Sequence, residues 1–147
     1  MSTDIQTTYA MSHHSIDPGN YDEQLQDKIA PLKQRFLDSG LAPEVVSGAF
    51  VASSQPKHYR LRAEFRIWHD GDDMHYAMFD PADPKTPVYI EQFDVASETI
   101  NQLMSELKAT VQPQQSLRRR LFQVEFLSTL AGDSLIALMY HRQLDEA

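Results

Sequence analysis

The sequence has no cysteine and only five glycines among its 147 residues. The lack of cysteine excludes disulfides and thiolate metal ligands. The glycines do not cluster into a turn that could cradle a nucleotide phosphate; they are Gly19, Gly40, Gly48, Gly71 and Gly132. No G-x-S-x-G motif occurs and no acid–base pair can be assigned to a pocket. We therefore predict no catalytic, cofactor-binding or metal-binding residue.

Long apolar runs and a secretory signal are also missing. No stretch approaches the roughly 20 apolar residues that cross a bilayer, and the N-terminus lacks a basic region followed by an apolar one. The formal net charge is −8, so the surface repels phosphate on average. We expect a cytoplasmic monomer with no membrane or DNA partner, in which any RNA site is a local patch.

The chain has the length of one domain. Residues 1–20 are polar without a sustained period and predict a flexible tail, in which His13 and His14 are solvated. Residues 21–147 predict a single α+β domain. The chain closes on LDEA directly after an expected strand, so we expect the natural chain to continue.

The first periodic segment has helical spacing and lies before a long loop. Its apolar side chains predict a helix that stops at Gly40: Tyr21, Leu25, Ile29, Leu32 and Phe36. Pro31 either kinks this helix or starts a second one. Residues 41–57 predict a loop.

After residue 57 the apolar residues recur at every second position instead of at helical spacing. Residues 58–68 alternate and predict a half-buried strand, with one face made of Tyr59, Leu61, Ala63, Phe65 and Ile67. The HDGDD turn, a strand over 74–79, a proline-broken loop over 80–87 and a strand over 88–93 complete a three-stranded antiparallel meander.

A helix and a hairpin follow the meander. Ser97 is expected to cap a helix ending near Val111, and Ser116 a shorter basic turn. The apolar runs 122–130 and 135–142, separated by AGDS, predict a second hairpin. The fold class is therefore α+β, an antiparallel sheet of a meander plus a hairpin with helices packed on it.

Two basic segments could hold RNA. The outward face of the first strand carries Arg60, Arg62, Arg66 and Trp68, and guanidinium groups both fork onto phosphates and stack on bases. The alternative is a solvated face on which Glu64 pairs with an arginine.

The second basic segment is Arg118, Arg119 and Arg120, followed by Phe122 and Gln123. An aromatic ring beside a run of cations can stack on an unpaired base while the arginines hold phosphates. The alternative is that Phe122 begins a core strand.

The HDGDDMH run, residues 69–75, has oxygen and nitrogen donors that could bind a divalent metal. The Asp70–Gly71 pair favours the simpler interpretation of an exposed hairpin turn.

Several segments resemble one family. The run HYRLRAEFRIWHDGDD at 58–73 is very similar to the matching stretch of TrmA-type tRNA (uracil-5-)-methyltransferases. Segments YDEQL, ASETINQLM, LFQVEFLSTL and LMYHRQLDE agree in the same order. The resemblance covers about residue 21 to the end.

The resemblance implies the N-terminal RNA-binding part of an enzyme that methylates C5 of the T-loop uridine in tRNA, with S-adenosylmethionine as donor. Such enzymes add a cysteine thiolate to C6 of uracil before methylation. This chain has no cysteine, so the nucleophile, the base and the cofactor pocket are expected in an absent C-terminal Rossmann-like domain. The fragment alone is predicted to be inactive and to hold no cofactor.

The resemblance also assigns residues. It implies that Arg66 and Phe122 contact the T-arm and T-loop. The charge pattern adds Arg62, Arg60, Arg120 and Gln123 as further RNA-binding candidates. A protein–protein interaction domain whose basic strand faces an acidic partner remains the alternative function.

Overall fold

The computed structural model describes residues 16–143, which form two compact units, 16–56 and 57–143. Most of the predicted tail, including His13 and His14, and the last four residues lie outside this range. No helix in the described range has both the length and the apolar character that crossing a bilayer requires.

The smaller unit is helical. It contains a short 3-10 turn, Pro18–Asn20, and the helices α1, Tyr21–Asp38, and α2, Pro43–Ser47. Pro31 lies inside α1 without ending it, so the one-helix alternative is correct. Gly40 follows the helix with φ +89°, a left-handed conformation that suits glycine. The expectation of a loop over 41–57 is wrong for the residues of α2, which begins at a proline.

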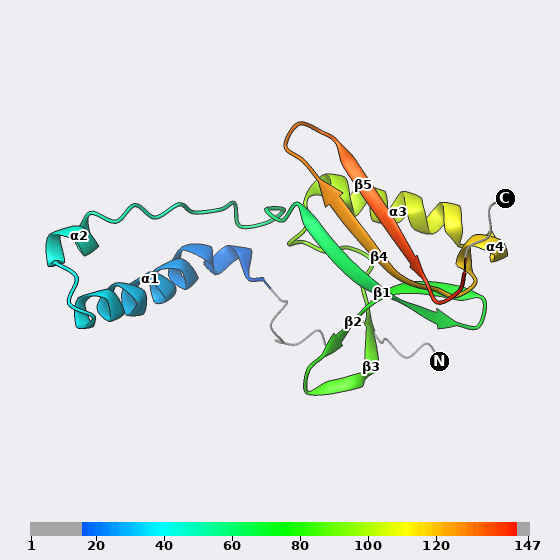
Figure 1. The fold of residues 1–147 in the computed structure, drawn as a ribbon, viewed down its shortest axis with the longest axis horizontal. Helices are drawn as coiled ribbons and strands as arrows, with labels where there is room; N and C mark the ends of the chain where they lie inside the picture. The colour runs from blue at the N-terminus through cyan, green and yellow to red at the C-terminus, as the bar shows by residue number, and fades with distance from the viewer. Residues whose placement is uncertain (1–15, 144–147) are drawn as a thin grey trace. The chain divides into compact units, whose positions relative to one another are not determined.

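The larger unit is built on one five-stranded antiparallel sheet (Figure 1). Its strands are β1, Arg62–Asp70; β2, Asp73–Asp80; β3, Asp83–Tyr89; β4, Leu121–Ser128; and β5, Ser134–Tyr140. The strand order is β3-β2-β1-β4-β5, so β1 joins the predicted meander to the predicted hairpin. The predicted α+β class is confirmed.

Strand β3 corrects the sequence prediction. Residues 83–87 were expected in a loop because of their prolines, yet they pair with β2, and the strand ends at Tyr89 rather than residue 93. Pro84 and Pro87 are tolerated because β3 is an edge strand, where a missing amide donor costs little.

Two helices follow the meander. Helix α3, Glu98–Val111, begins as predicted at Ser97, whose hydroxyl accepts a hydrogen bond from the Ile100 amide at 3.2 Å. Helix α4, Gln115–Arg118, starts two residues earlier than expected, so Gln114 rather than Ser116 occupies the cap position.

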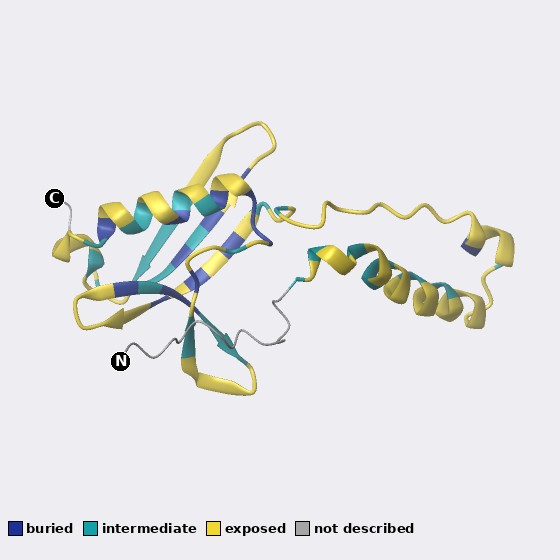
Figure 2. Cartoon of the chain, turned by 180° about the vertical axis from the view of Figure 1, so that it is seen from behind, coloured by how far each residue is buried: buried dark blue, intermediate teal, exposed yellow. Residues whose placement is uncertain are grey.

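The hydrophobic core lies between α3 and one face of the sheet. Ala63, Phe65 and Ile67 of the predicted apolar face of β1 are buried there, together with Ile100 and Met104 of α3. The strand begins at Arg62 rather than at residue 58, so Tyr59 and Leu61 precede it, and Tyr59 is exposed. Figure 2 shows the buried residues on the strands and on the side of α3 that faces them. Within residues 57–143, no helix covers the opposite face of the sheet (Figure 1 and Figure 2), and we call it the open face.

Candidate nucleic-acid interface

One row of side chains crosses the open face on all five strands. Arg66 of β1 is paired in register with Ala77 on one side and Gln123 on the other. Ala77 in turn is opposite Tyr89, and Gln123 is opposite Met139. Paired residues point to the same face of a sheet, so Arg66 stands at the middle of this row.

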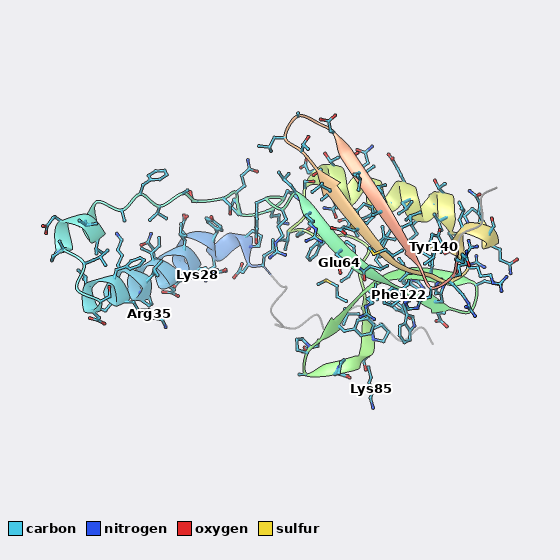
Figure 3. All side chains as sticks on the ribbon, viewed as in Figure 1. Lys28, Arg35, Glu64, Lys85, Phe122 and Tyr140 are labelled. Carbon is cyan, nitrogen blue, oxygen red and sulfur yellow. The ribbon has the colours of Figure 1, made fainter. Side chains whose placement is uncertain are left out.

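The Arg66 guanidinium contacts an aromatic ring from the neighbouring strand. Its central carbon lies 4.6 Å from the centroid of the Phe122 ring, a distance typical of a cation–π contact. The His141 imidazole also stacks on Phe122, with centroids 3.9 Å apart and planes 20° apart. We call Arg66, Phe122 and His141 the ring–arginine cluster; Figure 3 labels Phe122 at the start of β4.

A β-bulge brings Phe122 to this position. Leu121 is opposite Tyr140 and Gln123 is opposite Met139, so Phe122 is an extra residue between two ladder pairs. Leu121 and Val124 are both buried, although they are three residues apart. Because the bulge absorbs the odd residue, Phe122 is only half-buried and lies beside Arg66 instead of entering the core. Strand β4 is a core strand, as the alternative held, but the Phe122 side chain itself is not part of the core.

Two hydrogen bonds with Arg120 fix the position of His141. Its amide donates to the Arg120 carbonyl at 3.0 Å, and the Arg120 guanidinium donates to the His141 carbonyl at 3.3 Å. Arg120 has φ +60°, an uncommon conformation for a residue with a side chain. Arg120, predicted to bind RNA, therefore also holds the end of the hairpin.

Sequence reasoning assigned no role to His141, although a signal was present. Counting back along both strands from the AGDS turn brings residues near 140 opposite Phe122, as the observed pairing of Leu121 with Tyr140 shows. The hairpin register could therefore have placed the histidine within one residue of the position opposite the ring, whereas the stacking itself also depends on the bulge at Phe122.

The other strand arginines lie apart from the ring–arginine cluster. Arg62 donates a hydrogen bond to Glu125 and lies 3.5 Å from Glu64. The Glu125 carboxylate, through this hydrogen bond, raises the pKa of the Arg62 guanidinium. The solvated-face alternative thus describes Arg62. Arg60 precedes β1, with its backbone bonded to Val95 and Ser97.

Two arginines near α4, Arg118 and Arg142, are engaged in local structure. Arg118 donates to Asp72 at 2.7 Å and to the Gln112 carbonyl at 2.5 Å. Arg142 donates to the carbonyls of Arg119 and Ser116. These contacts tie α4 to the end of the hairpin and to the β1–β2 turn.

Three of the candidate metal ligands in the 69–75 turn, His69, Asp72 and Asp73, already form hydrogen bonds within the protein. A ring nitrogen of His69 lies 2.8 Å from the Leu121 carbonyl, and Asp73 accepts a hydrogen bond from Gln112 at 2.9 Å. Within residues 16–143, no three His, Asp or Glu side chains gather closely enough to hold a metal ion. The geometry gives the metal hypothesis no support.

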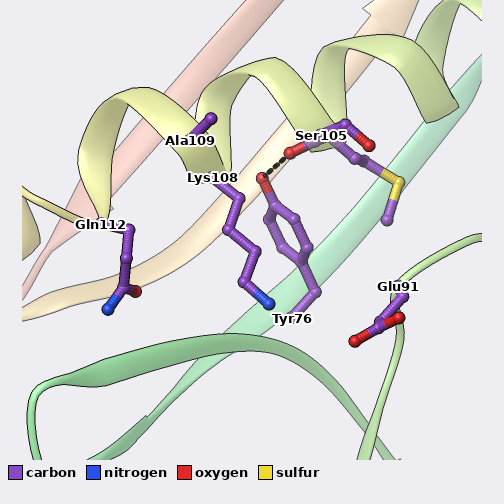
Figure 4. A pocket seen from close by; sticks show the side chains of 7 residues that line it. Tyr76, Glu91, Ser105, Lys108, Ala109 and Gln112 are labelled. Atoms are coloured by element: carbon purple, nitrogen blue, oxygen red, sulfur yellow. Dashed lines mark hydrogen bonds between the residues drawn. The ribbon is translucent and has the colours of Figure 1, made fainter.

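A shallow hollow of about 340 Å³ lies beside α3, on the core side of the sheet (Figure 4). Tyr76 forms part of it and donates its hydroxyl to the Met104 carbonyl at 2.9 Å. Burial raises the pKa of the Tyr76 phenol well above its usual range. Lys108 and Glu91 at its rim have opposite charges, and the hollow does not reach the open face.

The fold and this surface define a class of protein. One face of an antiparallel sheet packs on a helix, and the other presents stacked rings beside a guanidinium. Flat groups of this kind stack on unpaired bases while the cation attracts phosphate, which is typical of nucleic-acid-binding sheets.

Comparison with known proteins gives the family. The model of the tRNA (Uracil-5-)-methyltransferase family matches residues 20–147, so the chain belongs to this family and the predicted membership is confirmed. Over 133 residues, 90% of this chain, it is 53% identical to a tRNA/tmRNA (uracil-C(5))-methyltransferase of Dechloromonas aromatica (strain RCB). It is 52% identical over 133 residues to that of Aromatoleum aromaticum (strain DSM 19018 / LMG 30748 / EbN1), again 90% of this chain. The match spans only 35% of the length of either relative.

Proposed function

We propose that this chain is the RNA-binding part of an S-adenosylmethionine-dependent tRNA (uracil-5-)-methyltransferase, which grips the T-arm while C5 of the T-loop uridine is methylated. The observation that carries the proposal is the ring–arginine cluster, because it joins three flat groups from separate segments on the open face. Family membership supports tRNA as the ligand.

The cluster suits a nucleotide loop that must be opened. A base leaves its stack to reach a catalytic pocket, and unstacking costs a few kcal/mol. Flat side chains that replace the lost stacking lower this cost, and Arg66 adds a charge that attracts the adjacent phosphate. Gln123, the register partner of Arg66, supplies amide donors and an acceptor at the same place.

The residues of this chain do not form a pocket of the kind that binds S-adenosylmethionine, the methyl donor. All five strands are antiparallel, whereas a nucleotide-type cofactor pocket is built at a glycine-rich turn after a parallel strand. The glycines are dispersed and cysteine is absent. We therefore expect no methyl transfer from labelled S-adenosylmethionine by the 147 residues alone; measurable turnover would contradict this.

The test of RNA binding is fluorescence anisotropy with a labelled T-arm stem-loop. Replacing Phe122 or Arg66 by alanine is expected to weaken binding by roughly 1–3 kcal/mol, the usual contribution of a base-stacking side chain. His141→Ala is expected to have a similar effect because its imidazole extends the same stack.

Arg35→Ala is the matched control, since it removes an exposed cation from α1 in the other unit. It is expected to bind as tightly as the wild type. Wild-type affinity in all three cluster variants would remove these residues from the site, and a stem-loop that fails to bind the unchanged chain would refute the proposed function.

A further inference from the structure

The open face carries a second group of rings beyond the ring–arginine cluster. The Trp68 indole meets the Phe79 ring with centroids 6.1 Å apart, and the His75 imidazole lies flat on the Tyr89 ring at 4.2 Å and 7°. Trp68 is 38% exposed and Tyr89 is 42% exposed. We call these four side chains the β1–β3 ring group.

The register places this ring group next to the ring–arginine cluster. Trp68 follows Arg66 by two residues on the same face of β1, roughly 7 Å along the strand. Tyr89 lies in the same row as Arg66 but two strands away, roughly 10 Å across the sheet. Ala77 between them is only 1% exposed, which indicates that larger neighbours close over it. The two groups therefore form one continuous surface.

The hydrophobic core does not account for these exposed rings. The buried rings of Phe65, Tyr76 and Phe126 pack on the other face of the sheet, against α3. Rings left on the open face beside Arg66 offer flat apolar surfaces with a nearby cation, which suits unpaired bases whose phosphates need a counter-charge.

We propose that the β1–β3 ring group, through Trp68 and Tyr89, stacks unpaired nucleotides of the same RNA that the ring–arginine cluster holds. The inference rests on the proposed function and extends its contact surface from the ring–arginine cluster, on β1, β4 and the residue after β5, further along β1 and onto β2 and β3. RNA-binding sheets of other folds hold two or three bases on exposed rings in this manner.

Trp68 provides its own probe, because it is the only tryptophan in the chain. Titration of the 147-residue protein with an unlabelled T-arm stem-loop is expected to quench its emission as a base stacks on the indole. In parallel anisotropy experiments, Trp68→Ala and Tyr89→Ala are each expected to bind about tenfold more weakly.

Two further variants separate stacking from folding. Trp68→Phe keeps a ring in place and is expected to bind within about threefold of wild type, because every aromatic face can stack on a base. Phe50→Ala, which removes a 91% exposed ring from the other unit, is the matched control and is expected to leave affinity unchanged.

The outcomes distinguish this inference from the proposed function. RNA binding with unchanged Trp68 emission and wild-type affinity in Trp68→Ala and Tyr89→Ala would overturn the inference alone. Failure of the wild-type chain to bind the stem-loop at all would overturn both. Emission that shifts with protein concentration but not with RNA would assign this face to a second copy of the chain and also overturn the inference.

Discussion

Tyr76 is a polar side chain placed deep in the core. It is 2% exposed, packs against Phe65 and Phe126, and donates its hydroxyl to the Met104 carbonyl at 2.9 Å. This carbonyl belongs to α3, so the phenol joins the helix to β2 (Figure 4). Burial raises the pKa of Tyr76 because the ionised phenolate would lose its hydration there.

Tyr76→Phe is expected to lower the free energy of unfolding at pH 7 by about 1–2 kcal/mol, the cost of one buried hydrogen bond. The wild-type protein keeps this advantage in the free energy of unfolding below about pH 10, where the tyrosine of the unfolded state is neutral. Above that pH the unfolded state ionises while folded Tyr76 stays neutral, so the advantage shrinks by about 1.4 kcal/mol per pH unit.

Urea unfolding of both proteins at pH 7 and pH 11 measures this difference. The two proteins share every other ionisable group, so the contributions of those groups cancel in the difference. An advantage that stays constant between the two pH values would contradict the raised pKa.

Gln112 joins the end of α3 to the β1–β2 turn through one amide group. Its side-chain oxygen accepts from the Met74 amide at 2.9 Å, and its nitrogen donates to the Asp72 carbonyl and to Asp73. Gln112→Ala is expected to cost roughly 1–3 kcal/mol, because it leaves the Met74 amide without its acceptor.

Gln102→Ala is the control for this substitution, since Gln102 is exposed on the same helix and its amide donates only to Glu106. It is expected to change stability by less than about 0.5 kcal/mol. Equal thermal unfolding of the two variants would show that Gln112 does not support the turn.

At the scale of elements, the start of α3 is fixed by a pair of serines. Ser97 caps the helix, and its hydroxyl lies 2.9 Å from the Ser128 hydroxyl at the end of β4. Both side chains are buried, so each hydroxyl needs the other as a partner. The pair links helix α3 to the sheet at one defined position.

Ser97→Ala is expected to destabilise the protein by about 1–3 kcal/mol, because it removes both the cap and the partner of Ser128. Ser128→Ala is expected to cost less, since the cap remains. A double-mutant cycle by urea unfolding should find the double variant less destabilised than the sum of the single variants. Strict additivity would mean that the two hydroxyls are not coupled.

The elements that were predicted correctly are those whose signal is local. The alternation in β1 and the Ser97 cap each depend on a few consecutive residues, and both are confirmed. Strand β3 was missed because its prolines argue against a strand until the sheet order makes it an edge. Whether a strand lies at the edge of a sheet depends on residues far away in the sequence, so periodicity cannot predict it.

At the scale of the whole molecule, the ring–arginine cluster joins three distant segments. Arg66 comes from β1, Phe122 from the bulge in β4, and His141 directly follows β5. The charge pattern and the family resemblance pointed to the first two residues, but neither predicts the β1–β4 pairing that brings them together. Arg62 carried the same charge signal and is engaged with Glu125 instead, because cross-strand partners decide which cations stay available.

The overall charge of the protein predicts how salt affects RNA binding. With a net charge of −8, binding must depend on a few local cations, so the slope of log affinity against log salt should be shallow. Contact with two or three phosphates gives a slope of roughly −1.4 to −2 for unpaired RNA. A broad basic surface would give a much steeper slope.

Substitutions of Arg66 and of Phe122 distinguish the contribution of charge to RNA binding from the contribution of stacking. Arg66→Ala should make the slope shallower by about 0.7, because one phosphate contact is lost. Phe122→Ala should weaken binding at every salt concentration and leave the slope unchanged, because its uncharged ring releases no counterions. Anisotropy titrations over a series of potassium chloride concentrations measure both slopes. If Arg66→Ala kept the wild-type slope, the guanidinium would serve to orient the Phe122 ring rather than to hold a phosphate.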